Sequence, residues 1–278
     1  MTSFSGIHRV DPVDRAHLTG LSRPTPPIAR YAPTPALAPL VQRYWIPVWS
    51  LSEPSRQSTL QHPACLVVIS NSYARFYGVA RGLSTVVLEG RGWAAGVMLT
   101  PGAGRLLLGR PVSEVTDRHL DLDRLDTLNG PALTGAVRAA MAVDPAAESS
   151  HRRAVEAYER TLSAFLPLDA AGERINEVIG WLAEHPGTTR VAELARAFGA
   201  SERSLQRLVE ERVGLTPKWL IQRRRLHDAV ERLKAGTTSL ADIAAELGYT
   251  DQAHFTRDFR TVSGQTPGQF LADQPTRR

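Results

Sequence analysis

An internal repeat in the last hundred residues is the feature that most constrains how this chain folds. AELARAFGASERSLQRLVEERVGLTP at 192–217 aligns with ADIAAELGYTDQAHFTRDFRTVSGQTP at 241–267, with one residue inserted. Each copy reads as a short amphipathic helix, a turn containing glycine, a capping residue and a second helix that ends in Gly and then Thr-Pro. This is the pattern of a helix-turn-helix. Because the two copies are in register, a pair of ordinary helical hairpins is the weaker interpretation.

The second helix of each copy is predicted to have one apolar and one polar face, at about 100° per residue. Leu205, Leu208 and Val209 form the apolar face in the first copy, and Phe255 and Phe259 form it in the second. The polar faces carry Arg203, Gln206 and Arg207 in the first copy and Ala253, Thr256, Arg257 and Arg260 in the second, with Gln252 at the start of the second helix. Guanidinium and amide groups can make bidentate contacts to guanine and adenine in the major groove, so these faces are predicted to contact DNA.

A long helix around Arg223, Arg224 and Arg225 is predicted to join the two copies. About 19 residues at 1.5 Å each give roughly 30 Å, close to one turn of DNA, about 34 Å, so this helix can hold two recognition helices in successive major grooves. The three arginines point in different directions, and only one or two of them can face DNA. We expect Arg223 or Arg224 to contact phosphate and Arg225 to serve packing or an internal ion pair; a solvated charged face is the alternative for each.

Residues 173–272 resemble the DNA-binding domain of the AraC/XylS family of bacterial transcription regulators. The resemblance rests on the paired repeats, on R-L-x-x-A at 225–229, on DIAAELGYTDQAHFTRDFR at 242–260 and on GQTPGQF at 264–270. It implies sequence-specific promoter binding, with double-stranded DNA as partner and RNA polymerase as a further candidate partner. It also places base-reading positions on Arg203, Gln206, Arg207, Gln252, Ala253, Thr256 and Arg257. Ser201 and Thr250, at the matching helix starts, complete the predicted DNA-binding set; Ala253 departs from the pattern because it offers only shape or a methyl contact.

The chain ahead of the repeat reads as a β-rich domain. Short apolar runs between residues 31 and about 125 alternate with Gly, Pro, Asn and Ser, which is typical of strands and turns. Helical spacing returns from Pro131 to Leu166. We therefore predict an α+β protein: a flexible arm at 1–30, a β-rich, barrel-like sensor or dimerisation domain with accessory helices at 31–166, a linker at 167–172, an all-α domain of two helix-turn-helix units joined by a long helix at 173–272, and a tail at 273–278.

The chemistry of the β-rich domain is less clear from the sequence. The stretch 88–118 resembles a sensor domain found ahead of such regulators. Trp45, Tyr77 and Trp93 are candidates to line a small-molecule pocket, but core filling is the favoured interpretation for each. His62 and His119 stand apart, so they do not form the clustered His-x-His that a cupin-type metal site needs. We expect no catalytic residue, metal site or cofactor. A cupin-like enzyme and a ligand-independent architectural DNA-binding protein are the two alternatives to a ligand-controlled regulator.

Composition limits the remaining possibilities. The single cysteine, Cys65, excludes an internal disulfide and the several cysteines that a DNA alkyl-damage repair protein needs. No stretch has the apolar length needed to span a bilayer, and the N-terminus lacks a signal-peptide core, so a cytoplasmic protein that does not enter a membrane is expected. The apolar stripe at 131–166 suggests a homodimer, unless the β-rich part covers it. The repeat is also expected to carry its own core and to fold alone.

Overall fold

The computed structural model describes residues 26–236 and 239–272, in an order of elements that begins with strands and ends with helices. The strands are β1 (Ile28–Tyr31), β2 (Val41–Ser50), β3 (Ser55–Leu60), β4 (Leu66–Ser70), β5 (Ala74–Tyr77), β6 (Leu83–Leu88), β7 (Arg91–Leu99) and β8 (His119–Asp121). The helices are α1 (Gly104–Leu108), α2 (Gly130–Met141), α3 (Glu148–Leu162), α4 (Ala170–Glu184), α5 (Val191–Ala197), α6 (Glu202–Val213), α7 (Pro217–Ala235), α8 (Leu240–Glu246), α9 (Gln252–Ser263) and α10 (Pro267–Ala272). The expected α+β architecture is confirmed.

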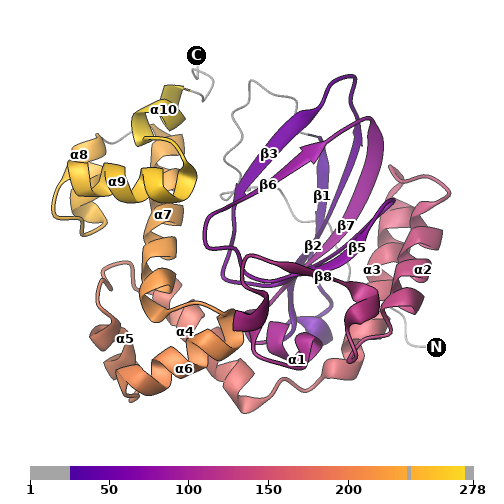
Figure 1. Ribbon diagram of the computed structural model, residues 1–278, viewed down its shortest axis with the longest axis horizontal. Helices are drawn as coiled ribbons and strands as arrows, with labels where there is room; N and C mark the ends of the chain where they lie inside the picture. Colours follow the sequence, from indigo (N-terminus) through magenta and orange to yellow (C-terminus); the bar gives the residue numbers. More distant parts are fainter. Residues whose placement is uncertain (1–25, 237–238, 273–278) are drawn as a thin grey trace.

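Two sheets form the β-rich part. Six strands pair antiparallel in the order β1-β2-β7-β4-β5-β8, and β3 pairs with β6 in a separate two-stranded sheet. We call the β3–β6 pair the hairpin wall, although β4 and β5 lie between the two strands in the chain. In Figure 1 the hairpin wall stands on one side of the larger sheet, and α2 and α3 cover the other side. The β-rich part that was predicted to be barrel-like therefore consists of two sheets on either side of a space, with helices behind the larger sheet.

Strand alternation gives the larger sheet two different faces. Tyr44, Ile46, Val67, Phe76 and Val97 are buried on the face that α2 and α3 cover. The hydroxyl of Tyr158 on α3 donates to the Ala95 carbonyl at 2.7 Å, which ties the helix to β7. The opposite face carries the alternate residues of the same strands and remains available to form a cavity.

The apolar stripe of the 131–166 region is covered within one chain. Leu133 and Val137 on α2 and Val155, Tyr158 and Leu162 on α3 are buried in the core behind the sheet. The stripe therefore offers no surface to a second copy, and the reason given for a homodimer is removed. The sequence pattern alone could not choose between the two ways of covering it.

The helical part contains the two predicted helix-turn-helix units and the joining helix. The first unit consists of α5 and α6 and the second of α8 and α9; α7 runs between them for 19 residues, as the spacing predicts. Gly214 and Gly264 end α6 and α9 in the left-handed conformation, with φ of 80° and 75°. Among the described residues, none of the helices is long and apolar enough to cross a membrane.

The predicted arm, linker and tail compare with the structure as follows. Most of the arm at 1–30 and all of the tail at 273–278 lie outside the described residues, but β1 begins at Ile28, so the β-rich part starts inside the predicted arm. The 167–172 linker is also shorter than expected, because α4 begins at Ala170 and the Asp169 carboxylate caps it by accepting from the Gly172 N–H at 2.8 Å. The division of the chain into domains stays a prediction.

Candidate nucleic-acid interface and ligand cavity

The predicted recognition helices α6 and α9 each bury one face and expose the other. Leu205 and Val209 are buried on α6, and Phe255 and Phe259 are buried at the matching positions of α9. The predicted DNA-binding residues Arg203, Gln206, Arg207, Gln252, Ala253, Arg257 and Arg260 are exposed, and Thr256 is half-buried. Each unit therefore presents basic and amide groups to solvent from a helix whose other side is fixed in a core.

The residues at the helix starts have different roles in the two copies. The Ser201 hydroxyl caps α6 by accepting from the Ser204 N–H at 3.1 Å. In the second copy the cap is Asp251, whose carboxylate accepts from the His254 N–H at 2.7 Å. Thr250 lies one residue earlier and is exposed. Because one residue is inserted here, the capping group is a hydroxyl in the first copy and a carboxylate in the second.

The three consecutive arginines of α7 reach three different neighbours. The Arg223 guanidinium is 2 % exposed, donates to the carbonyls of Ala80, Arg81 and Gly82, and lies 4.5 Å from the Trp219 ring centroid. Burial lowers the pKa of Arg223 to about 10. A phosphate contact by Arg223 is therefore wrong for this structure, because its side chain is enclosed against the β-rich part.

The next two arginines stay within the helical part. Arg224 donates to Asp228 at 2.7 Å and to the Pro186 carbonyl, and burial is the first cause that lowers its pKa. Arg225 is buried with its guanidinium carbon 3.7 Å from the Tyr249 ring centroid, which agrees with the expected packing role. The phosphate contact predicted for Arg224 stays a prediction, and it would require the side chain to exchange these protein contacts for DNA.

The first unit shares a core with the β-rich part. Leu194, Leu205, Val209 and Val213 belong to one continuous buried cluster with residues of α1 and of the 112–115 turn. The Thr116 hydroxyl donates to the Gly214 carbonyl at 2.8 Å, and the Arg105 Nε lies 2.6 Å from a Glu211 carboxylate oxygen. The expectation that the repeat carries an independent core does not hold for this half.

The second unit has a separate core, and among the described residues Leu60 is the one residue of the β-rich part that belongs to it. This cluster consists of Leu60 with Leu226, Ala229, Val230, Leu233, Ile243, Ala244, Leu247, Tyr249, Phe255, Phe259 and Phe270. Leu60 ends β3, is 2 % exposed, and pairs in register with Leu83, which packs on the same cluster. The end of the hairpin wall is therefore part of the second unit's core.

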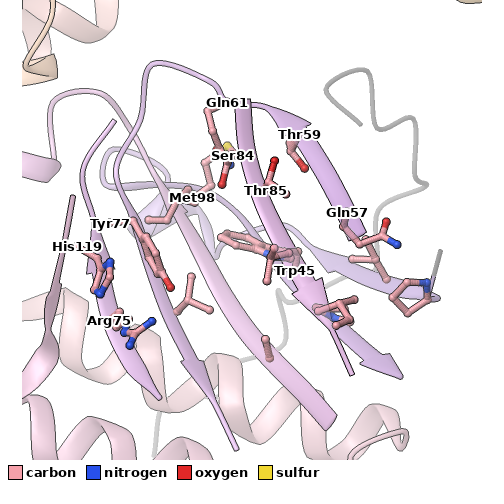
Figure 2. A pocket seen from close by; sticks show the side chains of 18 of the residues that line it. Trp45, Gln57, Thr59, Gln61, Arg75, Tyr77, Ser84, Thr85, Met98 and His119 are labelled. Atoms are coloured by element: carbon pink, nitrogen blue, oxygen red, sulfur yellow. The ribbon is translucent and has the colours of Figure 1, made fainter. Parts of the chain in front are cut away.

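A cavity of about 540 Å³ lies between the hairpin wall and the larger sheet, within the usual size range of small-molecule sites. Its floor is the exposed face of β1, β2, β4, β5 and β7, and its opposite side is the hairpin wall (Figure 2). Trp45 lies flat on the floor because the facing residue is Gly96; a Cβ there would come within 2.2 Å of the Trp45 ring. The Trp45 ring thus forms a flat apolar surface inside the cavity.

The candidate ligand residues divide between cavity and core. Trp45 and Tyr77 line the cavity, whereas Trp93 does not; it is 8 % exposed and belongs to the buried core. The neighbours of Trp93 on β7 explain this, because Ala94 lines the cavity and successive side chains point to opposite faces. Trp93 is therefore a core residue, in line with the favoured interpretation, and is no longer a ligand candidate.

Sequence reasoning missed the basic side of this cavity. Arg75 and Tyr77 on β5, and Tyr73 just before it, occupy alternate positions and line the cavity. His119 from β8 lies beside them, with its ring centroid 5.4 Å from that of Tyr77. The signal was the alternation Tyr-x-Arg-x-Tyr next to a buried strand. His62 also lines the cavity and stacks on His227 of α7, with ring centroids 4.6 Å apart. Within 26–236 and 239–272, no three His, Cys, Asp or Glu residues lie together as a metal-binding group.

Two family models match separate stretches of the chain. Residues 194–273 match the family model described as a helix-turn-helix domain, and residues 29–121 match a domain of unknown function (DUF6597). The HTH-type transcriptional activator RhaS of Escherichia coli strain SE11 is 32% identical over 101 residues, which cover 36% of this chain and 36% of RhaS. The chain therefore spans about a third of the length of this relative. The AraC/XylS resemblance is confirmed for the C-terminal repeats, and the N-terminal part has no matched role.

Two solved structures have low overall similarity. ToxT from Vibrio cholerae O395 matches with a TM-score of 0.42 and 12% identity, over 83% of this chain and 97% of that chain. The C-terminal domain of AraT from Geobacillus stearothermophilus matches with a TM-score of 0.35 and 20% identity, over 38% of this chain and 86% of that chain. At these scores neither structure adds to the argument from the chain's own residues.

Proposed function

We propose that this chain, whose residues 173–272 form an AraC/XylS-type double helix-turn-helix domain, is a sequence-specific DNA-binding transcription regulator and not an enzyme. The matched relative is named as a transcriptional activator. The proposed partner is promoter DNA in the bacterial cytoplasm; RNA polymerase is a candidate partner. We make no proposal of a dimer.

The observation that carries this proposal is the pair of matched helices α6 and α9. Each exposes an arginine at the same point of the repeat, Arg207 and Arg257, while the opposite face is buried. The helix α7 between the two units is about 30 Å long at 1.5 Å per residue, near the 34 Å of one DNA turn. Two arginines so held can each read a base edge in successive major grooves.

Control by a small molecule is part of the proposal, and the hairpin wall supplies a physical route for it. The hairpin wall lines the cavity through residues such as Thr59 and Thr85, and its Leu60 end packs in the core of the second unit. A ligand that contacts the hairpin wall changes how freely this strand pair moves, and therefore acts on the second unit. This favours a sensor over a ligand-independent architectural protein.

The test begins with selection of bound duplexes from fragmented bacterial genomic DNA by the purified full chain. On the selected site, Arg207→Ala and Arg257→Ala should each cost about 1 to 3 kcal/mol of binding free energy and should relax base preference in one sub-site only. Arg196→Ala, an exposed arginine on α5 and so outside both recognition helices, serves as the control.

The binding measurements should be made at several salt concentrations, because phosphate contacts weaken with salt whatever the sequence. A base reader discriminates target from random DNA at every salt concentration. Equal losses on target and random DNA for Arg207→Ala and Arg257→Ala would contradict base reading. The repeat would then act as an electrostatic clamp.

A further inference from the structure

The cavity has a chemical polarity that identifies a class of ligand. We propose that it binds a carboxylate with a flat apolar body, the carboxylate against Arg75 and the apolar body over the Trp45 ring. This inference rests on the proposed sensor function and names its effector class.

The basic end of the cavity is built by one strand and its neighbour. Tyr73, Arg75 and Tyr77 line the cavity from alternate positions, while Phe76 between them is fully buried on the other face of the sheet. In Figure 2, Arg75, Tyr77 and His119 gather at one side of the cavity. The buried Phe76 fixes the strand's facing, so the Arg75 side chain is directed to this side by the core behind it.

Arg75 is held in place and stays charged. Its Nε lies 3.4 Å from an Asp121 carboxylate oxygen, and its guanidinium carbon lies 5.0 Å from the Tyr73 ring centroid. A hydrogen bond with the Tyr77 side chain is the main cause that raises the pKa of Arg75. Burial raises the pKa of Tyr73 to about 12, so this phenol remains a neutral donor. An arginine with two phenols beside it suits a carboxylate, which can accept two parallel hydrogen bonds from the guanidinium.

The charge of the lining favours an anion. Among the residues described as lining the cavity there are three arginines, Arg30, Arg43 and Arg75, and two histidines, but no Asp or Glu. Asp121, which pairs with Arg75, is not part of the lining. An anionic ligand is attracted to basic side chains in a cavity, and Arg75 is the one that the two phenols flank.

The floor and the hairpin wall select the rest of the ligand. The Trp45 ring, held flat by Gly96, is next to Met98, Val68 and Leu66, which together offer an apolar surface for a planar group. The hairpin wall opposite carries Thr59, Ser84 and Thr85, whose hydroxyls can meet polar atoms on the ligand's edge (Figure 2). The ligand is therefore enclosed between an aromatic floor and a polar wall.

The test uses two probes that differ only in charge, indole-3-acetate and indole-3-acetamide, with the purified full chain in titration calorimetry. The carboxylate should bind about tenfold tighter than the amide, since a hydrogen bond to an ionised group is roughly twice as strong as a neutral one. Arg75→Gln should remove this preference. Arg56→Gln, an exposed arginine on β3 outside the lining, should leave it intact.

A second variant keeps the test decisive if Arg75→Gln does not fold. Asp121→Asn retains Arg75 and removes the carboxylate that competes for it, so indole-3-acetate should bind more tightly. The proposal is overturned if neither probe binds, if the amide binds as tightly as the carboxylate, or if the preference survives Arg75→Gln. DNA selection with the same protein sample is separate, so loss of DNA binding would count against the proposed function and not against this site.

Discussion

The two helix-turn-helix units repeat each other in sequence but are integrated into the protein differently. The first unit shares a continuous core with the β-rich part and is tied to it by Thr116 and Arg105. The second unit has its own core. Among the described residues, Leu60 at the end of the hairpin wall is the one residue of the β-rich part in that core, and Leu83 packs against it. The repeat therefore fixes the shape of each unit, while the residues outside the repeat decide how firmly each is held.

This difference assigns the two recognition helices different mechanical roles. Helix α6 cannot move without disturbing the core of the β-rich part, whereas α9 is connected through α7 and the hairpin wall. The position of α6 is therefore fixed by the β-rich part, whereas the position of α9 can be adjusted.

The first prediction compares matched core residues. Leu205→Ala and Phe255→Ala should cost about 2–5 and 3–5 kcal/mol of local stability, because each removes a fully buried side chain. Hydrogen exchange read by mass spectrometry should show that Leu205→Ala accelerates exchange in α6, α1 and the 112–115 turn. Phe255→Ala should accelerate exchange in α8 to α10, in the part of α7 from Leu226 and at the Leu60 end of β3, and leave α6 and α1 unchanged. Identical exchange patterns for the two variants would break the contrast.

The second prediction compares two glycines at the same point of the repeat. Gly214→Ala and Gly264→Ala both place alanine in the left-handed region, which costs about 1–2 kcal/mol. At Gly214 the new Cβ would also come within 2.4 Å of the Thr116 hydroxyl, whereas at Gly264 the space is open. Overpacking should add about 1–3 kcal/mol at Gly214 alone.

The check is thermal unfolding of both variants and of a double variant. In a Thr116→Ala background the excess cost of Gly214→Ala should shrink, since the closest atom is gone. Any excess that remains there is assigned to the backbone of residues 112 and 113, which lies 3.0 Å from the added Cβ. Equal costs at the two glycines would mean that the first unit is not clamped at this point.

The third prediction concerns the ion pair of Asp169 with Arg212, whose counterpart in the second copy is Val262. Arg212 is buried, and two of its guanidinium nitrogens lie 2.8 and 2.5 Å from the two Asp169 carboxylate oxygens. The hydrogen bond from Arg212 is the largest cause that lowers the pKa of Asp169. A lowered folded pKa means that this stabilisation is present above the unfolded value of about 4 and is lost as pH falls through the folded value.

Asp169→Asn keeps a capping side chain on α4 and removes only the charge. It should cost about 1 kcal/mol near pH 7, a modest figure because Asp169 is 43% exposed, and its deficit should narrow below about pH 4. Unfolding measured across pH 3 to 7 checks this. A deficit that does not change with pH would show that the ion pair is not its cause.

Local patterns explain what the sequence could predict. The helix period, the glycines at 214 and 264 and the buried Leu205 and Phe255 lie within single units, so helices, turns and exposed faces followed directly. The arginines of α7 could not be assigned this way. Arg223 is enclosed by the carbonyls of residues 80–82, more than 140 positions earlier in the chain, and helix periodicity contains no information about such a neighbour.

The cavity was only partly predictable for a similar reason. Trp45 and Tyr77 were identified as aromatic residues on expected strands, but β5 has four residues, too few for its alternation to stand out. The hairpin wall pairs β3 with β6 across two intervening strands, so the residues opposite the floor could not be named before that pairing was known. The sequence could not separate Trp93 in the core from Trp45 and Tyr77 in the cavity, because the facing of each strand was unknown.

The position of Leu60 has a practical consequence for building chimeric regulators. A junction near residue 170 would seem natural, since it separates the β-rich part from the repeats along the chain. Such a fusion would give a foreign second unit an unsuitable Leu60, and would leave this chain's own second unit with an unfilled hole where Leu60 had been. Interchangeable parts in this protein are therefore defined by which side chains share a core, so a transplanted reading unit needs the residue at position 60 matched to it.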